Sequence, residues 1–193
     1  KQMRGKKMKK ILFIGLFLLA GCSVFYPTWN KSSLDIMNSA EIKEDSFAKT
    51  KVIYFQKVKP YILQDRKQIT GTYDTLPGYF YLRALIDIKN DKPKIFQICI
   101  VTDNSSSWGF YNKAIDKDGV ELKFTEIDRQ IKTKSAGVNT VEYFALSFDL
   151  DYLKKHKNDN LIIKVFGQRD EFVFYVPQSY LDGVFKYFEK TNI

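Results

Sequence analysis

Hydrophobic positions first occur as one uninterrupted run near the start of the chain. Residues 11–20 contain no charged side chain, whereas residues 1–10 contain six Lys and Arg residues. A basic head, a short apolar run and a small-residue cleavage site are the parts of a secretory signal peptide. A transmembrane helix needs roughly twenty apolar residues, which this run does not supply. We therefore expect residues 1–21 to be a signal peptide, with a membrane anchor or a buried core helix as weaker alternatives.

The pattern then becomes polar. Residues 22–50 are expected to form a tether, with one short helix after Ser33. A flexible segment of about 25 residues has a root-mean-square reach of roughly 25–30 Å, which holds a domain clear of lipid headgroups. Phe25, Tyr26 and Trp29 either lie at the membrane interface, where amphipathic rings are favoured, or pack on the domain.

From Lys51 onward the apolar residues alternate with polar ones, which is the period of a half-buried strand. The clearest case is residues 78–88, where the even positions from Phe80 to Ile88 are all apolar. Residues 116–119 and 167–170 have the composition of hairpin turns. Strands are predicted over residues 51–58, 78–88, 94–102, 110–115, 120–127, 140–148, 161–166 and 171–176. We expect a mainly β protein, an antiparallel β-sandwich of about seven or eight strands.

Two helices complete the prediction. Residues 149–156 have acids at the front and bases at the end, which suits the helix dipole and a short crossover helix. Ser179 can cap a final amphipathic helix whose apolar stripe has helical spacing (Leu181, Val184, Phe185 and Phe188). Gly183 costs about 1 kcal/mol against Ala there, so we expect close packing onto the sheet. Residues 51–193 should form a single β-rich domain.

The charge balance is misleading until it is divided along the chain. The net charge of +9 comes from 31 basic and 22 acidic residues. Six of the basic residues and none of the acidic ones lie in residues 1–21, so the mature chain has a net charge of only +3. That value is ordinary for a soluble surface, so we do not expect the protein to bind nucleic acid.

The cysteines are two, at positions 22 and 99. Cys99 lies in the apolar run 95–101, and we expect a small buried core residue without a disulfide partner. A reactive thiol would need an electropositive and partly exposed setting, which the neighbouring residues do not provide.

The sequence offers little catalytic chemistry. The single histidine, His156, lies among lysines and is expected to be solvated. Ser105–Ser107 lacks the spacing of a nucleophile elbow. Glu126 and Asp128 could serve a carboxylate-based glycan hydrolase, yet nothing distinguishes them from the other acids. We predict no catalytic residue.

Residues 116–119 have a partial likeness to a calcium-binding loop. Aligning Gly119 with the invariant glycine puts Ala114 at the first ligand position and Thr125 where a bidentate Glu is needed. Both positions fail, so we predict a hairpin turn, no metal site and no cofactor other than a covalent lipid.

One aromatic group is a candidate binding patch. Trp108, Phe110 and Tyr111 follow a serine-rich loop. They either form an exposed patch that contacts a partner protein or a glycan, or pack in the core.

The end of the signal carries a family resemblance. Leu19-Ala20-Gly21-Cys22 resembles the lipobox of bacterial prolipoproteins, with an aliphatic residue, two small residues and Cys. The resemblance implies that Leu19, Ala20 and Gly21 are read by the signal peptidase, that cleavage precedes Cys22 and that Cys22 is lipidated. Two or three acyl chains hold a protein stably on a bilayer. Ser23 implies the outer membrane if the source is Gram-negative. We expect translation to start at Met3 or Met8.

The sequence thus predicts a lipid-anchored protein of the bacterial cell envelope. We expect a non-catalytic module that binds an envelope protein partner or supports an assembly. The alternatives are a glycan-active hydrolase of the envelope and a surface-exposed adhesin. The lipobox resemblance ends at residue 22 and leaves the partner and the oligomeric state open.

Overall fold

The computed structural model describes residues 31–45, 49–59, 61–62, 75–89, 91–104, 107–134 and 137–192. The predicted signal peptide, the lipobox with Cys22 and the aromatic residues of the predicted tether lie outside this part of the chain. Within it, no helix combines the length and the apolar character needed to cross a bilayer.

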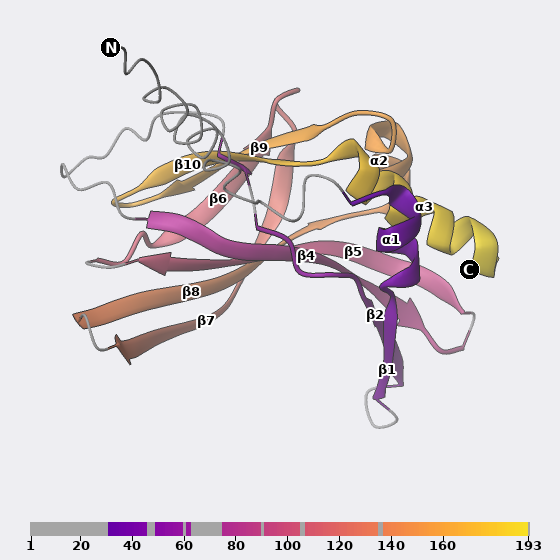
Figure 1. The fold of residues 1–193 in the computed structure, drawn as a ribbon, viewed down its shortest axis with the longest axis horizontal. Coiled ribbons are helices and arrows are strands. Elements are labelled where there is room, and N and C mark those ends of the chain that lie inside the picture. Colours follow the sequence, from indigo (N-terminus) through magenta and orange to yellow (C-terminus); the bar gives the residue numbers. More distant parts are fainter. Residues whose placement is uncertain are drawn as a thin grey trace, which may run out of the picture.

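The described residues form ten strands and three helices (Figure 1). The strands are β1 (Glu41–Asp45), β2 (Thr50–Tyr54), β3 (Tyr61–Ile62), β4 (Thr75–Asp87), β5 (Lys92–Asn104), β6 (Tyr111–Asp116), β7 (Glu121–Lys134), β8 (Gly137–Phe148), β9 (Leu161–Gly167) and β10 (Glu171–Val176). The helices are α1 (Ser33–Asn38), α2 (Leu150–His156) and α3 (Gln178–Thr191).

All strand pairs are antiparallel, and they form one sheet of order β1-β2-β4-β5-β8-β7-β6-β9-β10-β3. The sheet curls so that β6, β9 and β10 face β4, β5 and β8 (Figure 1). After β2, Val58 still pairs with β4, whereas Tyr61–Ile62 pairs with β10. The chain therefore crosses from one layer to the other between Val58 and Tyr61. The predicted antiparallel sandwich is confirmed, with its layers as two halves of one sheet. The strands that we did not predict are β1 and β3.

The core lies between these layers and follows the predicted alternation. Phe80, Leu82, Ala84 and Ile86 of β4 are buried, whereas Ile88 is exposed because β4 has already ended. On β5, residues 96–102 are all buried, so both faces of the sheet are covered there. Cys99 is one of them and has no disulfide partner.

Two helices match the predicted positions. α2 begins after Asp149, whose side chain accepts the N–H of Tyr152 at 2.8 Å. α3 buries its whole apolar stripe (Leu181, Val184, Phe185 and Phe188). The capping role of Ser179 is wrong, because α3 begins at Gln178 after Pro177. No side chain caps this helix, and the ring of Pro177 restricts φ at its start instead.

The predicted tether boundary at residue 50 is also wrong. Ser32 and Asp35 form a capping box at the start of α1, and β1 pairs along β2. α1 buries Ile36 against α3 at Gly183, where a Cβ atom would lie 2.5 Å from the Ser33 carbonyl oxygen. Gly183 thus does allow close packing, but onto α1 rather than the sheet. Besides Ile36, the Ser39 hydroxyl accepts the Gln56 N–H at 3.1 Å and Ala40 packs against the core, so the segment is joined to the domain at several points.

Candidate functional site

The three residues of the predicted aromatic patch differ in burial. Trp108 and Phe110 are half-buried and lie near each other, with ring centroids 6.3 Å apart. Tyr111 is 2% exposed, and its hydroxyl donates a hydrogen bond to Asp170 Oδ2 at 2.8 Å. Tyr111 as part of an exposed patch is therefore wrong, because β6 turns its ring into the core.

Two other elements hold the loop that carries Trp108 and Phe110. On one side, β8 contributes Thr140, which donates to the Ser107 carbonyl at 3.0 Å, and Glu142, which accepts the Gly109 N–H at 2.7 Å. On the other side, the N–H groups of residues 168 and 169, between β9 and β10, donate to the carbonyls of residues 110 and 109. The loop therefore bridges the two layers.

The loop backbone depends on close approaches. A Cβ on Gly167 would lie 2.4 Å from the Gly109 carbonyl oxygen, and one on Gly109 would overlap the Tyr111 ring. Phe110 itself has φ of 52°, in the left-handed region that a bulky residue rarely adopts. Strained backbone of this kind persists only where its surroundings hold it in place, and it occurs often at binding sites.

Two guanidinium groups lie close to the Phe110 ring. The Cζ atoms of Arg129 on β7 and Arg169 on the β9–β10 turn are 5.1 and 5.3 Å from its ring centroid. We call Trp108, Phe110, Arg129 and Arg169 the arginine–aromatic cluster. Trp and Arg are among the residue types most enriched where a few residues dominate protein–protein binding, and Phe is enriched in the cores of interfaces.

Glu142 fixes one of the two arginines. It is 2% exposed, and its Oε1 accepts a hydrogen bond from Arg129 Nε at 3.3 Å while Oε2 accepts the Gly109 N–H. Arg129 also pairs with Glu126 at 2.9 Å. One buried carboxylate therefore aligns both the loop and the guanidinium that flanks Phe110.

Beside the cluster, β7 has an open edge. β7 pairs with β8 from Lys123 to Lys134, but it pairs with β6 only through Glu121 and Leu122. Beyond that point no described strand pairs with its second edge, and the β7–β8 hairpin diverges from β6 (Figure 1). We call residues 123–134 the β7 edge.

Exposed apolar side chains accompany this edge. Ile131 is 66% exposed, and Ile127 and Val138 are exposed as well. Ile131 lies two residues after Arg129, and its partner Thr140 lies two residues after Val138. Alternate residues of a strand share a face, so Ile131 and Val138 lie on the same face of the hairpin as Arg129.

The carboxylates considered for hydrolysis lie on the same strand. Glu126 and Asp128 are both exposed, at a bulge around Ile127. Glu126 pairs with Arg129, and Asp128 accepts from the Gln130 side chain at 2.6 Å. Their contacts are those of surface charges on a strand.

The prediction that His156 is solvated is wrong. His156 is 3% exposed, its ring lies 4.4 Å from that of Tyr152, and its Nε2 is 3.9 Å from Asp116 Oδ2. Burial and the Lys155 charge lower the pKa of His156. The lysine-rich sequence hid this position, because α2 turns Leu153 and His156 inward together.

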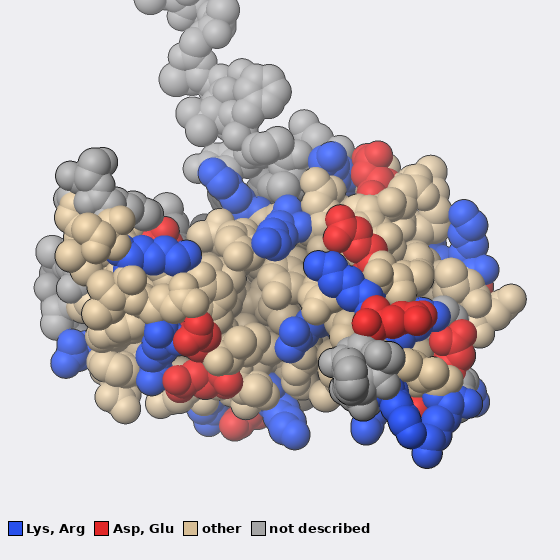
Figure 2. All heavy atoms as spheres, turned by 90° about the horizontal axis from the view of Figure 1, so that it is seen from below, with Lys and Arg blue, Asp and Glu red and all other residues tan. Residues whose placement is uncertain are grey.

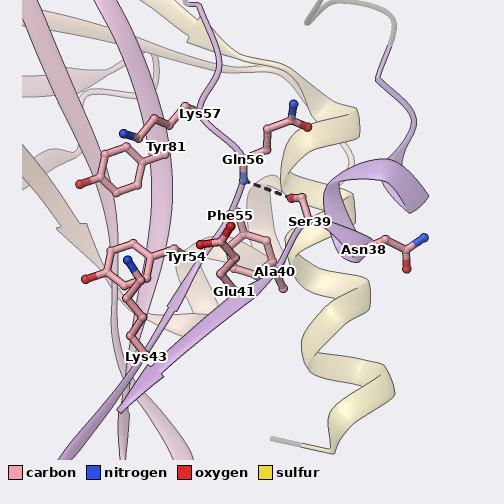
Figure 3. Close-up of a pocket in the computed structure, with 10 residues that line it drawn as sticks. All are labelled: Asn38, Ser39, Ala40, Glu41, Lys43, Tyr54, Phe55, Gln56, Lys57 and Tyr81. Atoms are coloured by element: carbon pink, nitrogen blue, oxygen red, sulfur yellow. Dashed lines mark hydrogen bonds between the residues drawn. The ribbon is translucent and has the colours of Figure 1, made fainter. Parts of the chain in front are cut away.

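A hollow of about 880 Å³ lies elsewhere, between α1, β1, β2 and β4 (Figure 3). Tyr54 and Tyr81 line it side by side, and Lys43 and Lys57 lie over aromatic rings at 4.8–5.9 Å. The hollow exists because α1 and β1 fold back onto the domain, so a prediction with residues up to 50 as tether could not find it.

Charges of both signs are spread over the face seen in Figure 2, where Lys and Arg alternate with Asp and Glu. A nucleic acid binds to a surface of one sign, and this face does not offer one.

The chain matches no family model, and no curated protein or solved structure is significantly similar to it. The fold class is an antiparallel β-sheet curled into a sandwich, with short helices.

Proposed function

We propose that this chain is a lipid-anchored protein of the bacterial envelope, and that its β-rich domain binds a partner protein. The anchor rests on the lipobox at Leu19–Cys22. The binding surface is the arginine–aromatic cluster together with the β7 edge. The observation that carries the proposal is Phe110, held at a positive φ close to Arg129 and Arg169, beside a strand edge with which no described strand pairs.

The open edge supports a definite mode of binding. An extended segment of the partner would add as a strand along the β7 edge and form main-chain hydrogen bonds. Ile131 would contact its apolar side chains, and the arginine–aromatic cluster would fix its end. Charged residues and a bulge also keep exposed edges from pairing indiscriminately. Glu126, Asp128 and Lys132 would thus select the partner by charge.

The test is crosslinking in cells that produce the tagged full chain, followed by identification of the adducts. Phe110→Ala and Ile131→Asp should each remove the same reproducible adduct, because loss of a central binding residue costs about 2 kcal/mol or more. Glu189→Ala, on the exposed side of α3, is the matched control and should retain it. An adduct pattern unchanged by both surface variants would overturn the proposed binding surface.

A further inference from the structure

A second group of polar side chains lies where the β6–β7 turn meets α2. Asp116 ends β6, Asp118 lies in the turn and His156 ends α2. One ligand atom from each residue lies within 4.8 Å of the other two. The group is separate from the arginine–aromatic cluster and independent of the function proposed above.

His156 supplies the observation that points to a ligand. Its ring is buried, and among the described residues its Nε2 has no hydrogen-bond partner. Buried polar atoms of native proteins nearly always have a partner, and each exception needs an explanation. This Nε2 lies 3.9 Å from Asp116 Oδ2, too far for a hydrogen bond but close enough for both atoms to contact one ion.

The surrounding hydrogen bonds orient Asp116 toward His156. Asp116 Oδ1 accepts the N–H groups of Asp118 and Val120 at 2.9 and 2.8 Å. Asp116 Oδ2 accepts the Tyr152 hydroxyl at 2.7 Å. A carboxylate oxygen accepts at two positions, so Oδ2 retains one toward His156. Hydrogen bonds that hold a ligating carboxylate in this way are typical of metal sites.

We propose that Asp116, Asp118 and His156 bind one divalent transition-metal ion, for which Zn²⁺ is the best-fitting ion. One imidazole nitrogen and two carboxylate oxygens are a donor set that zinc accepts, with water as the fourth ligand. Ca²⁺ and Mg²⁺ take oxygen ligands instead. Ligand atoms about 2.0–2.1 Å from zinc in a tetrahedron lie about 3.3 Å apart, so His156 and Asp116 need to approach by roughly half an ångström.

The ion would reach the site from the side of Asp118, which is exposed. Lys155 Nζ now lies 3.2 Å from Asp118 Oδ2 and neutralises that carboxylate. Zinc would replace this ion pair, and it would fasten α2 to the β6–β7 turn. Lys155 therefore competes with the metal for Asp118, so a substitution that removes the Lys155 charge should raise the affinity for zinc.

Calorimetric titration with Zn²⁺ alone tests the site, on the full chain in detergent without a polyhistidine tag. We expect one ion per chain. Because His156 is the only histidine, its ring nitrogen signals in a ¹⁵N NMR spectrum report on this site directly, and Nε2 should shift on zinc addition. Mg²⁺ should give neither effect. No Zn²⁺ binding, or binding without a shift of His156 Nε2, would overturn the proposal.

Variants separate ligation from a structural role. His156→Gln and the exposed Asp118→Asn should each weaken Zn²⁺ binding at least about tenfold, the lower end of what even outer-shell partners contribute. Lys155→Gln should strengthen it. Asp151→Asn, an exposed acid on α2 that pairs with Lys154, is the matched control and should leave the affinity unchanged. If His156→Gln fails to fold, Asp118→Asn decides: unaltered Zn²⁺ affinity in that variant contradicts the site.

Discussion

Single hydroxyl and carboxylate groups join the elements of this fold. The Tyr180 hydroxyl donates to the Gln56 carbonyl at 2.8 Å and accepts the Leu82 N–H at 3.0 Å. Phe55 and Val58 both form backbone hydrogen bonds with β4, but residues 56 and 57 between them do not. The Leu82 N–H therefore has no backbone partner at this point, and the Tyr180 hydroxyl accepts it instead. One side chain of α3 thereby completes the β4 ladder.

Tyr180→Phe should lower the free energy of unfolding by about 1–3 kcal/mol, since it leaves the buried Leu82 N–H without a partner. Urea denaturation measures the change. Tyr187→Phe is the control on the same helix, because among the described residues the Tyr187 hydroxyl has no hydrogen bond. Equal losses in the two variants would show that the bridge does not contribute.

Cys99 should be inert in the folded chain. It is 2% exposed, and burial raises the pKa of its thiol, so the reactive thiolate is scarce at neutral pH. In the Cys22→Ala chain, where Cys99 is the remaining cysteine, a thiol reagent should label it only after urea is added. Rapid labelling of the native chain would contradict this burial.

At this scale the sequence predicted Cys99 but missed the most informative polar residues. Thr140, Glu142, Phe144, Leu146 and Phe148 alternate along β8, and all are buried. A carboxylate at an inward position of a predicted strand is a usable signal, and it would have identified Glu142. Nothing in the sequence placed Arg129 and Arg169 near Phe110, because the contact joins a loop, a strand and a turn that are far apart along the chain.

The elements differ in how far pattern alone could find them. Alternating positions of β4 and the apolar stripe of α3 were visible because each buries one complete face. β1, with the sequence Glu-Ile-Lys-Glu-Asp, has no such face and depends on its pairing with β2. β7 and β8 extend to residues 134 and 137, past the predicted strand ends. They form a hairpin whose outer part pairs with no other described strand.

Gly183→Ala tests the contact between α1 and α3. Helix propensity alone would make alanine stabilising by about 1 kcal/mol. Here a Cβ atom would lie 2.5 Å from the Ser33 backbone oxygen and 2.7 Å from Ile36 Cβ, so we expect destabilisation and release of α1. Urea denaturation gives the sign, and limited proteolysis within residues 31–45 reports the release. A more stable protein with an unchanged cleavage pattern would place α1 elsewhere.

For the whole molecule, the anchor and the domain have separate evidence. The lipobox resemblance of Leu19–Cys22 underlies the proposed attachment to a membrane, whereas the β7 edge and the arginine–aromatic cluster underlie the proposed contact with a partner. Fold class was predictable because strand periods and turn residues recur along the chain. The binding surface was not, because it combines a loop, a strand edge and a turn that are brought together only by the curled sheet.

Cys22→Ala tests the anchor. Labelling with radioactive palmitate should disappear, and the precursor should accumulate unprocessed, because the proposed lipid would be attached to the Cys22 thiol. The matched control is Cys99→Ala, which should be labelled and processed as the parent chain is. Normal processing of Cys22→Ala would mean an ordinary signal peptide or a membrane anchor instead of a lipoprotein signal.

The central claim is that the β7 edge binds a partner, and a photo-crosslinking amino acid placed at Ile131 tests it most directly. Ile131 is exposed beside Arg129, so illumination of intact cells should yield one discrete adduct with an envelope protein. The same amino acid at Glu189 on α3 should yield none, and Phe110→Ala should remove the adduct formed at position 131. No adduct at position 131, or identical adducts at both positions, would contradict the claim.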